Sequence, residues 1–367
     1  MGHSSSPVKV GNLFIGGNSP VSIQSMTNTD TTAIGPTLEQ IHGLIAAGCE
    51  LVRVAVPDER SAAALGELKK NISIPIIADI HFDYRLALLS IAEGADKIRI
   101  NPGNIGNRDE LARIAYAAGE KGVALRIGIN AGSLERELRE KYKYNRAEAL
   151  VDSALNNVEF LESKCSFTSI VVSLKANDVP TTVDAYEKAA AQLSYPFHLG
   201  ITEAGRGLRG TVKSSLGIGA LLLKGIGDTI RVSLTGDPLD EIPVAKELLQ
   251  VSGVRRFGPE IISCPTCARC KINVVQLVEK VEELLINVDL PIKIAVMGCP
   301  VNGPGEAREA DIGISGGDGF GIVFKDGKVF KKIPFEKILV ELEKELMAII
   351  TTQNHWNKQD NRMEENK

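Results

Sequence analysis

The chain has few aromatic residues, no long apolar run and no excess of charge of one sign. Phe, Trp and Tyr make up 5% of the 367 residues, with a single Trp, which is too few for the aromatic platforms that stack nucleic-acid bases. The 42 Lys and Arg against 46 Asp and Glu leave a net charge of −4, which argues against a general nucleic-acid binder. No apolar run reaches the roughly 18 residues that a membrane helix needs. We therefore expect neither nucleic acid nor a membrane as a partner.

Cysteine is also scarce, and the chain shows no targeting segment. Its first ten residues, MGHSSSPVKV, lack the apolar core of a signal peptide, so we expect a cytoplasmic protein. Disulfides are rare in that compartment, where clustered cysteines are more often metal ligands or catalytic groups. Cys49 and Cys165 stand alone and are expected to be small buried thiols. The other four cysteines fall close together and form a candidate site.

Eight short β-branched runs, each followed by a helical pattern, fill residues 21–253. The runs are VSIQSM (21–26), LVRVAV (51–56), PIIADI (75–80), KIRINP (97–102), ALRIGI (124–129), SIVVSLK (169–175), PFHLGI (196–201) and TIRVSL (229–234). Strict alternation implies a parallel sheet, and eight such units fit a closed (β/α)8 TIM barrel. A doubly wound open sheet is the alternative. It is disfavoured because the first turn, SMTNTDTT, lacks the glycine-rich phosphate fingerprint.

The alternation of strand-like and helical segments ends near residue 254. Beyond it the order is a cysteine cluster, a helix, short strands around a glycine-rich turn, and a final helix, which predicts a small α+β domain. The expected organisation is an N-terminal lead-in (1–20), the barrel (21–253), a linker (254–263), the α+β domain (264–352) and a polar tail that frays (353–367).

Polar side chains occupy the carboxyl ends of the barrel strands, where Val, Ile and Leu are usual. They are Arg53, Asp79, His81, Lys97, Arg99, Asn101, Arg126, Asn130, Ser173, Lys175, Asn177, His198, Thr202, Arg231, Ser233 and Thr235. Cations from several strands would converge at the barrel mouth, and two charges about 4 Å apart interact by about 4 kcal/mol at an effective dielectric constant of about 20. A bound phosphate or diphosphate would relieve this repulsion and suits both Arg and Lys. The alternative is a structural network in which these residues pair with one another and with Asp79 and Glu203.

The cysteine cluster predicts a metal centre. Cys264, Cys267 and Cys270 have Cys-x-x-Cys-x-x-Cys spacing, and Cys299 follows in the segment GCP. Structural zinc takes four thiolates, commonly from two Cys-x-x-Cys pairs, whereas iron–sulfur clusters also use thiolates at ferredoxin-like spacing. The spacing alone leaves both metals open.

A glutamate close to the last cysteine adds a further candidate ligand. The turn VNGPGE can bring Glu306 back toward Cys299. A carboxylate is a harder and poorer ligand for such a cluster than a thiolate, so it would leave one iron exchangeable. The alternative is a solvated loop acid beside Arg308 and Glu309.

Distinctive blocks of sequence run through the whole chain. They are QSMTNTDT, RVAVPDER, ADIHFDYRLAL, KIRINPGNIG, RIGINAGSL, VVSLKANDV, HLGITEAG, SCPTC and GCPVNGPGEAREADIG. On these blocks the chain resembles the bacterial 4-hydroxy-3-methylbut-2-enyl diphosphate synthases (the IspG or GcpE family) of the non-mevalonate isoprenoid pathway. The resemblance implies a TIM barrel followed by a small [4Fe–4S] domain. It also implies reductive ring opening of 2-C-methyl-D-erythritol 2,4-cyclodiphosphate to 4-hydroxy-3-methylbut-2-enyl diphosphate, an oxidoreductase reaction with loss of water.

The same resemblance assigns roles to individual residues. The cluster ligands map onto Cys264, Cys267, Cys299 and Glu306, whereas the family pattern does not use the position of Cys270. The cyclic diphosphate would be bound by Arg53, Arg99, Arg126, Asn130, Lys175 and Arg231. Glu203 is the expected proton donor or relay, with His81 and Asp79 as further candidates. The alternative for Glu203 is a salt bridge to the substrate-binding cations, which we call the clamp.

The resemblance also implies partners. Reduced ferredoxin or flavodoxin would deliver two electrons through the cluster, one at a time. A homodimer is expected, in which the cluster domain of one subunit caps the barrel of the other. Two other hypotheses remain: a zinc-stabilised, non-redox barrel enzyme acting on a phosphorylated sugar or pterin, and an iron–sulfur sensor that binds a phosphorylated metabolite without turnover.

Overall fold

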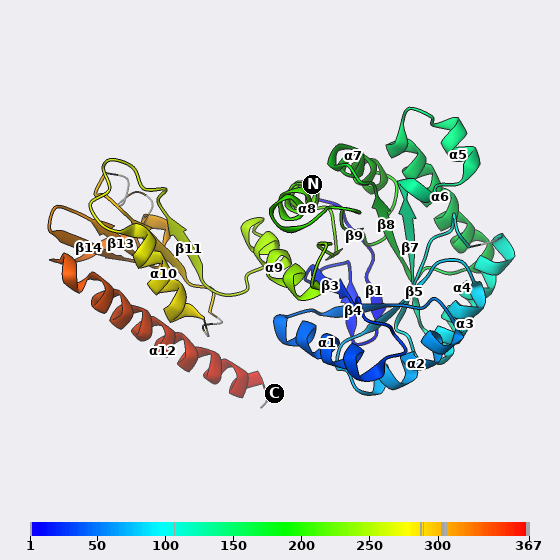
Figure 1. Ribbon diagram of the computed structural model, residues 1–367, viewed down its shortest axis with the longest axis horizontal. Helices are drawn as coiled ribbons and strands as arrows, with labels where there is room; N and C mark the ends of the chain where they lie inside the picture. Colours follow the sequence, from blue (N-terminus) through cyan, green and yellow to red (C-terminus); the bar gives the residue numbers. More distant parts are fainter. Residues whose placement is uncertain are drawn as a thin grey trace. The chain divides into compact units, whose positions relative to one another are not determined.

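The computed structural model describes residues 2–105, 107–286, 288, 290–301, 305 and 307–364. The chain divides into two compact units, Met1–Arg255 and Arg256–Lys367, which are described separately (Figure 1). None of the helices in the described ranges is both long and apolar enough to cross a membrane.

The first unit is a barrel of eight parallel strands. They are β3 (Ser22–Met26), β4 (Leu51–Ala55), β5 (Ile76–Ile80), β6 (Lys97–Ile100), β7 (Ala124–Asn130), β8 (Ile170–Lys175), β9 (His198–Leu199) and β10 (Thr229–Ile230). The hydrogen-bonded order is β8-β7-β6-β5-β4-β3-β10-β9. A parallel bridge between Val172 and Phe197 joins the two ends, which confirms the predicted TIM barrel. The last two strands are shorter than their sequence runs.

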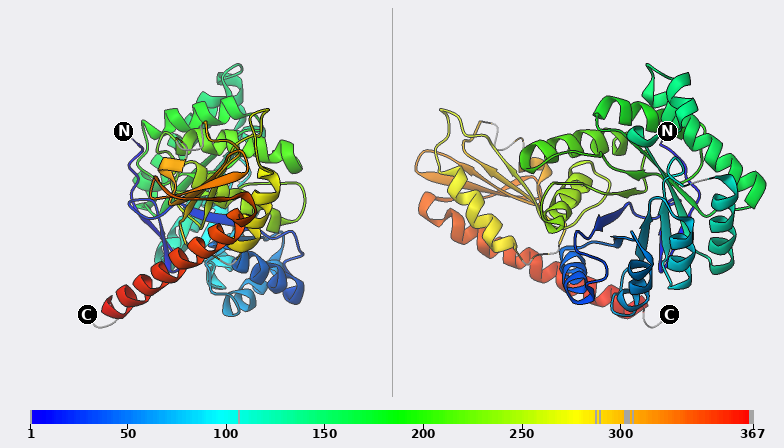
Figure 2. Two further views of the ribbon diagram at one scale, coloured as in Figure 1. Left: turned by 90° about the vertical axis from the view of Figure 1, so that its left-hand side faces the viewer. Right: turned by 45° about the vertical axis from the view of Figure 1, so that its right-hand side comes forward.

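Helices surround the strands of the barrel (Figure 2). They are α1 (Ile34–Ala47), α2 (Glu59–Lys70), α3 (Tyr84–Ala92), α4 (Arg108–Lys121), α5 (Arg136–Lys141), α6 (Arg146–Cys165), α7 (Val179–Ala190), α8 (Gly207–Leu222) and α9 (Glu241–Val251). Their ends follow local rules, because Asp58, Asn107 and Asp178 accept hydrogen bonds from first-turn N–H groups. The short helix α5 is an addition between β7 and α6.

The N-terminal segment, expected only as a lead-in, forms an antiparallel hairpin of β1 (Val8–Val10) and β2 (Leu13–Ile15). Its buried side chains pack against Leu51, Ile77, Ala124 and Val171. Leu51 and Ala124 are the first residues of their strands, so the hairpin covers the amino-terminal end of the barrel. The carboxyl ends of the strands are left to form the site.

The second unit is a five-stranded sheet with two long helices. Its elements are β11 (Glu260–Ser263), α10 (Val274–Leu285), β12 (Lys293–Met297), β13 (Ile312–Gly316), β14 (Phe320–Lys325), β15 (Lys328–Pro334) and α12 (Ile338–Glu364). The predicted α+β domain is confirmed, with two differences. The end of the expected linker 254–263 is strand β11, which pairs in parallel with β12. The helix α12 continues to Glu364, where we expected a frayed tail.

Candidate functional site

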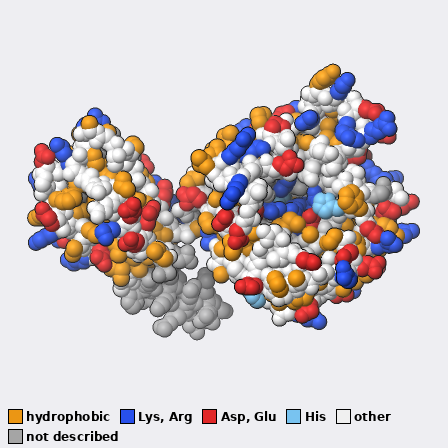
Figure 3. Space-filling view, viewed as in Figure 1, with side chains coloured by type: hydrophobic (Ala, Val, Ile, Leu, Met, Phe, Trp, Pro, Cys, Tyr) orange, Lys and Arg blue, Asp and Glu red, His pale blue; other side chains and the backbone are white. Residues whose placement is uncertain are grey.

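A cavity of about 240 Å³ opens at the carboxyl ends of the barrel strands. Figure 3 shows it as a hollow in the barrel unit that contains Lys or Arg and His side chains. Its lining includes the barrel residues to which the sequence analysis assigned a binding or catalytic role: Arg53, Asp79, His81, Arg99, Arg126, Asn130, Lys175, Glu203 and Arg231. Of the wider polar set expected at the strand ends, Lys97, Asn101, Asn177, His198 and Thr235 do not line it. Ser173, Ile201, Thr202 and Ser233 also line it.

The parallel register explains how this cavity is assembled. Asp79 on β5 stands opposite Arg99 on β6, which stands opposite Arg126 on β7. Asn130 and Lys175 are register partners on β7 and β8. Side chains two residues apart share one face of a strand, and register partners on neighbouring strands lie at the same level of the barrel. The polar side chains near the carboxyl ends of the strands are therefore brought to the same end of the barrel.

Asp79 is the acidic centre of the cavity. Its Oδ1 accepts a hydrogen bond from Arg99 NH1 at 3.1 Å, and its Oδ2 lies 3.2 Å from His81 Nε2. Burial alone would raise the pKa of Asp79, but Arg53, the His81 hydrogen bond and Arg99 outweigh it and hold the pKa well below its usual range. Asp79 is therefore an ionised carboxylate that positions Arg99 and His81 in the free protein.

Inside the barrel, the buried cations outnumber the buried carboxylates, since Arg53, Lys97, Arg99, Arg126 and Lys175 are buried against Asp79 and Glu241. Lys97 and Arg126 are 0% and 1% exposed, and Lys97 Nζ and Arg126 Nε and NH1 have no hydrogen-bond partner in the part of the chain that the structure describes. Burial, aided by the neighbouring cations, lowers the pKa of Lys97, Arg126 and Lys175 well below their ordinary values. Burial also lowers the pKa of Arg53 to about 10. Burial therefore disfavours the charged forms of these side chains, and an anion bound among them would compensate their positive charge.

Two guanidinium groups point at a weak acceptor. Arg53 Nε lies 3.0 Å and Arg231 NH1 lies 3.6 Å from the sulfur of Met26. A thioether is a poor substitute for a carboxylate or phosphate oxygen. These donors are thus available to a stronger acceptor that enters the cavity.

Glu241, at the start of α9, is a buried acid that the sequence analysis missed. It is 2% exposed, and it accepts hydrogen bonds from Arg231 Nε and NH2, both at 3.3 Å, and from Ser25 Oγ at 3.0 Å. The structural-network alternative therefore applies to Arg231 and Arg99, which have carboxylate partners, but not to Arg126. No sequence signal distinguished Glu241 from an ordinary first-turn acid.

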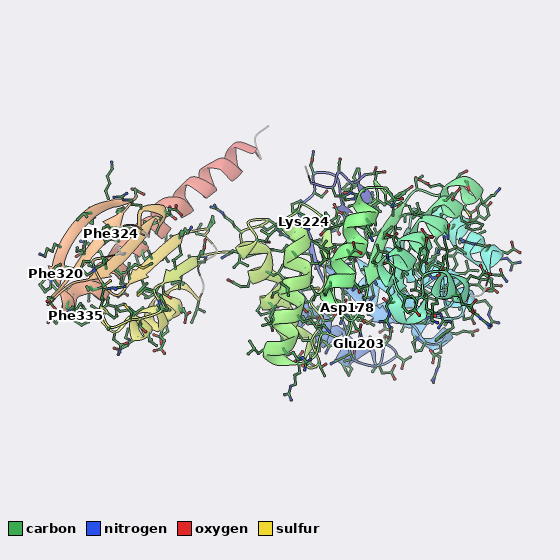
Figure 4. All side chains as sticks on the ribbon, turned by 90° about the horizontal axis from the view of Figure 1, so that it is seen from above. Asp178, Glu203, Lys224, Phe320, Phe324 and Phe335 are labelled. Carbon is green, nitrogen blue, oxygen red and sulfur yellow. The ribbon has the colours of Figure 1, made fainter. Side chains whose placement is uncertain are left out.

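Glu203 lies in a strained backbone conformation at the rim of the cavity. Its φ of 53° falls in the left-handed region, which non-glycine residues rarely adopt and which is often retained at functional sites. Figure 4 places it at the edge of the barrel unit. Within the described ranges its carboxylate forms no ion pair with the cations of the cavity. The salt-bridge alternative for Glu203 thus finds no contact in this structure.

The acidic centre leads to a stability prediction. Asp79→Asn should lower the free energy of unfolding at pH 7 by about 3–5 kcal/mol, because it leaves Arg99 and Arg53 with less compensation. Since the folded pKa of Asp79 is depressed, its stabilisation is present above the unfolded pKa of about 4 and is lost as the pH falls below it. Denaturant unfolding at pH 7 and pH 3 should show the difference between variant and wild type shrinking at pH 3.

Asp184→Asn is the matched control for this experiment. Asp184 forms an exposed ion pair with Lys188, and such pairs contribute less than about 1 kcal/mol. Equal effects of the two variants at pH 7, or a difference for Asp79→Asn that does not depend on pH, would contradict the role assigned to Asp79.

Two cysteines of the second unit, Cys264 and Cys299, lie at the ends of two neighbouring strands. Cys264 follows β11 and Cys299 lies two residues beyond β12, and the strands are in parallel register with Ser263 opposite Val296. Gly298 N donates a hydrogen bond to Cys264 Sγ at 3.1 Å. A side chain at Gly298 would collide with Cys270 Sγ and approach Cys264 Sγ to 3.2 Å. Only glycine therefore leaves room beside these sulfurs.

The four sulfurs differ in their surroundings. Cys267 is exposed and the others are half-buried. Cys264 accepts a main-chain hydrogen bond, as a thiolate ligand does, whereas Cys270 Sγ donates to the carbonyl oxygen of Ile272 at 3.0 Å. This difference favours Cys264 over Cys270 as a ligand.

The donor set fits an iron–sulfur cluster in chemistry. Soft thiolates and a main-chain N–H directed at one of them are features of such sites. Among the described residues, no three His, Cys, Asp or Glu side chains are grouped closely enough to hold a metal ion. The predicted fourth ligand, Glu306, lies outside the described residues.

Comparison with known proteins relates both units to one family. Residues 5–246 match the GcpE TIM-barrel domain and residues 260–348 match the GcpE protein C-terminal domain. A protein of Caldanaerobacter subterraneus subsp. tengcongensis is 54% identical over 94% of this chain and 96% of its own. One from Anoxybacillus flavithermus is 54% identical over 93% of each chain. Both are named 4-hydroxy-3-methylbut-2-en-1-yl diphosphate synthase (flavodoxin).

A solved structure supports the barrel fold alone. The type I 3-dehydroquinate dehydratase of Clostridium difficile covers 68% of this chain and 98% of its own, with a TM-score of 0.50 and 12% identity. At that identity the likeness concerns the fold and not the chemistry.

Proposed function

The chain belongs to the GcpE family, and from that premise we propose that it catalyses the reaction for which its relatives are named. The reaction is the reductive ring opening and dehydroxylation of 2-C-methyl-D-erythritol 2,4-cyclodiphosphate to 4-hydroxy-3-methylbut-2-enyl diphosphate. The observation that carries the proposal is the barrel-mouth cavity, with buried cations that have no anionic partner in the described residues. A cyclic diphosphate supplies the missing negative charge.

The clamp residues act on the charge of the substrate. Arg99, Arg126, Lys175 and Arg231 bind the diphosphate, assisted by Arg53 and Asn130. As the ring opens, negative charge grows on the departing phosphate oxygen, and donors that are already positioned stabilise it without reorganisation. Asp79 fixes the orientation of Arg99 through its 3.1 Å hydrogen bond.

Three residues that line the cavity, Glu203, His81 and Asp79, are candidates for roles in proton transfer to the departing hydroxyl group. Glu203 is the first, because it lines the cavity in a strained backbone conformation and its carboxylate is not engaged with the clamp. His81 lies at the rim with a half-exposed ring and contacts Asp79. A proton can therefore be supplied through His81, whose ring Asp79 orients, or through Glu203.

Cys264, Cys267 and Cys299, together with Glu306, would hold a [4Fe–4S] cluster in the second unit. When bound, this group supplies the two electrons of the reaction one at a time. The names of the relatives include flavodoxin, which supports flavodoxin as the donor; ferredoxin is the alternative. We further propose a cytoplasmic homodimer in which one chain's second unit serves the barrel of the other.

An anaerobic turnover experiment tests the function. Protein purified without oxygen should contain iron and sulfide, and with reduced flavodoxin it should convert the cyclic diphosphate to the linear product, followed by ³¹P NMR. Binding of the substrate without product would indicate a sensor. Zinc in place of iron and sulfide would indicate the non-redox alternative. Either result would overturn the proposal.

A further inference from the structure

A second cavity lies beside the barrel mouth, and of its lining the proposed reaction uses only Glu203. Its volume is about 330 Å³, and its polar lining includes Arg139, Lys143, Arg146, Asn177, Thr202 and Glu203. Only Thr202 and Glu203 also line the barrel-mouth cavity described above. The two spaces therefore adjoin each other across the strained residue Glu203.

The charge of this second cavity is positive. Its lining carries three cations, Arg139, Lys143 and Arg146, against the single acid Glu203. In the described part of the chain, neither Arg139 nor Arg146 forms a side-chain hydrogen bond or ion pair. Figure 3 shows Lys and Arg side chains over α5, beside the hollow of the mouth.

Two nearby acids that could neutralise these cations, Glu140 and Asp152, already have other partners. Glu140 pairs with Arg136 at 2.9 Å, and Asp152 accepts from Lys141 Nζ at 2.9 Å and from Tyr142 Oη at 2.5 Å. The pairing of Lys141 and Tyr142 with Asp152 anchors the turn after α5, which carries Lys143. The local structure thus holds the three cations around one concave space rather than pairing them.

The amino end of α6 adds to the positive potential. The helix begins at Arg146 and runs for 20 residues, and the partial positive charge at a helix amino end favours anions. Guanidinium groups recognise phosphate through two parallel hydrogen bonds. The volume is at the lower end of the range for small-molecule sites.

We propose that this cavity is a second subsite that binds the phosphate groups of a small phosphorylated metabolite. Its position beside the mouth allows it to capture an anionic ligand close to the clamp, which raises the local concentration of the ligand. The cyclic substrate and the linear diphosphate product both carry this chemistry. The identity of the occupant rests on the proposed function, but the existence of the subsite does not.

Titration calorimetry with inorganic pyrophosphate tests the subsite in the full-length protein. Wild type should bind two equivalents, one at the clamp and one at the subsite. Arg126→Met should abolish one binding event and keep the other. Arg139→Ala/Arg146→Ala should weaken that other event by at least about tenfold, since it removes the two guanidinium groups that line the subsite.

The matched control is Arg60→Ala/Arg113→Ala, which removes two exposed cations that do not line either cavity and do not pair with the acids near the subsite. It should keep both binding events. A single equivalent in wild type, or equal behaviour of the two double variants, would overturn the subsite. This readout involves no turnover, so failure of the subsite and failure of the proposed reaction are distinguishable.

Competition identifies the occupant. With Arg126→Met, in which the clamp is disabled, the cyclic substrate and the linear product are each titrated against bound pyrophosphate. Displacement by the cyclic compound assigns the subsite to substrate capture, and displacement by the linear compound assigns it to product. If neither displaces pyrophosphate at millimolar concentration, the proposed metabolite class is wrong.

Discussion

Replacing Arg126 by Met should make the protein more stable and nearly inactive. Arg126 is 1% exposed, and two of its nitrogens have no partner in the described structure. Substituting apolar residues for buried charges often raises stability by about 1–4 kcal/mol, and each kcal/mol shifts the melting temperature of a domain this large by about 2–4 °C. Met preserves much of the side-chain volume, so we expect a higher melting temperature.

The same substitution should lower kcat/KM for the cyclic diphosphate by about 30- to 5,000-fold. Truncating one partner of a buried charge pair costs about 2–5 kcal/mol of binding, and each 1.36 kcal/mol corresponds to tenfold in rate. Calorimetric melting and anaerobic kinetics measure the two effects on one preparation. A higher melting temperature together with a lower kcat/KM would show that the free protein does not compensate the cost of burying Arg126. That cost would instead be compensated by the bound anion.

Arg231→Met is the matched control, because it removes the same charge from the same cavity. Arg231 has a buried carboxylate partner in Glu241, so its loss leaves an uncompensated charge and should destabilise the protein by about 3–5 kcal/mol. Activity should fall in both variants, whereas stability should change in opposite directions. A lower melting temperature for Arg126→Met would contradict the conclusion that the free clamp lacks an anion.

The sequence predicted the barrel well because its signal is local and repeated. Each strand run is followed by an amphipathic helix, and parallel pairing then places residues such as Asp79, Arg99 and Arg126 in adjacent rows. Most of the polar set at the mouth could thus be predicted from spacing, although Lys97 and His198 lie at the starts of β6 and β9 and do not line the cavity. The sequence could not show which cation has a carboxylate partner, because Glu241 contacts Arg231 from a helix rather than from a strand. Side-chain pairing across elements depends on tertiary distances that periodicity does not encode.

The elements that the sequence analysis missed are short strands that lie outside the repeated strand–helix pattern of the barrel. The segment 8–15 was expected as a lead-in, yet Val8, Val10 and Ile15 are buried against the base of the barrel. Strand β11 was expected as part of a linker, because EIIS is too short to show an alternating pattern. Its pairing with β12 places Cys264 beside Gly298, so the missed strand is the one that positions the first cysteine.

Replacing Cys264 by Ser should remove most of the bound iron and sulfide, whereas replacing Cys270 by Ser should keep them. Cys264 Sγ accepts a hydrogen bond from Gly298 N, as a ligating thiolate does, while Cys270 Sγ donates one to Ile272 O. A serine hydroxyl is a poor ligand for iron that is otherwise held by soft thiolates. Iron and sulfide analysis and visible absorption of anaerobically purified protein measure the difference without any assay of turnover.

Cys165→Ser controls for general effects of losing a thiol, since Cys165 is a buried cysteine of the barrel unit and should keep full iron content. The contrast between Cys264 and Cys270 is the decisive comparison, because both sulfurs lie beside the same glycine. If Cys270→Ser loses iron as completely as Cys264→Ser does, then Cys270 is a ligand and the set of Cys264, Cys267, Cys299 and Glu306 is wrong. If neither variant loses iron, the cluster does not lie in the second unit at these cysteines.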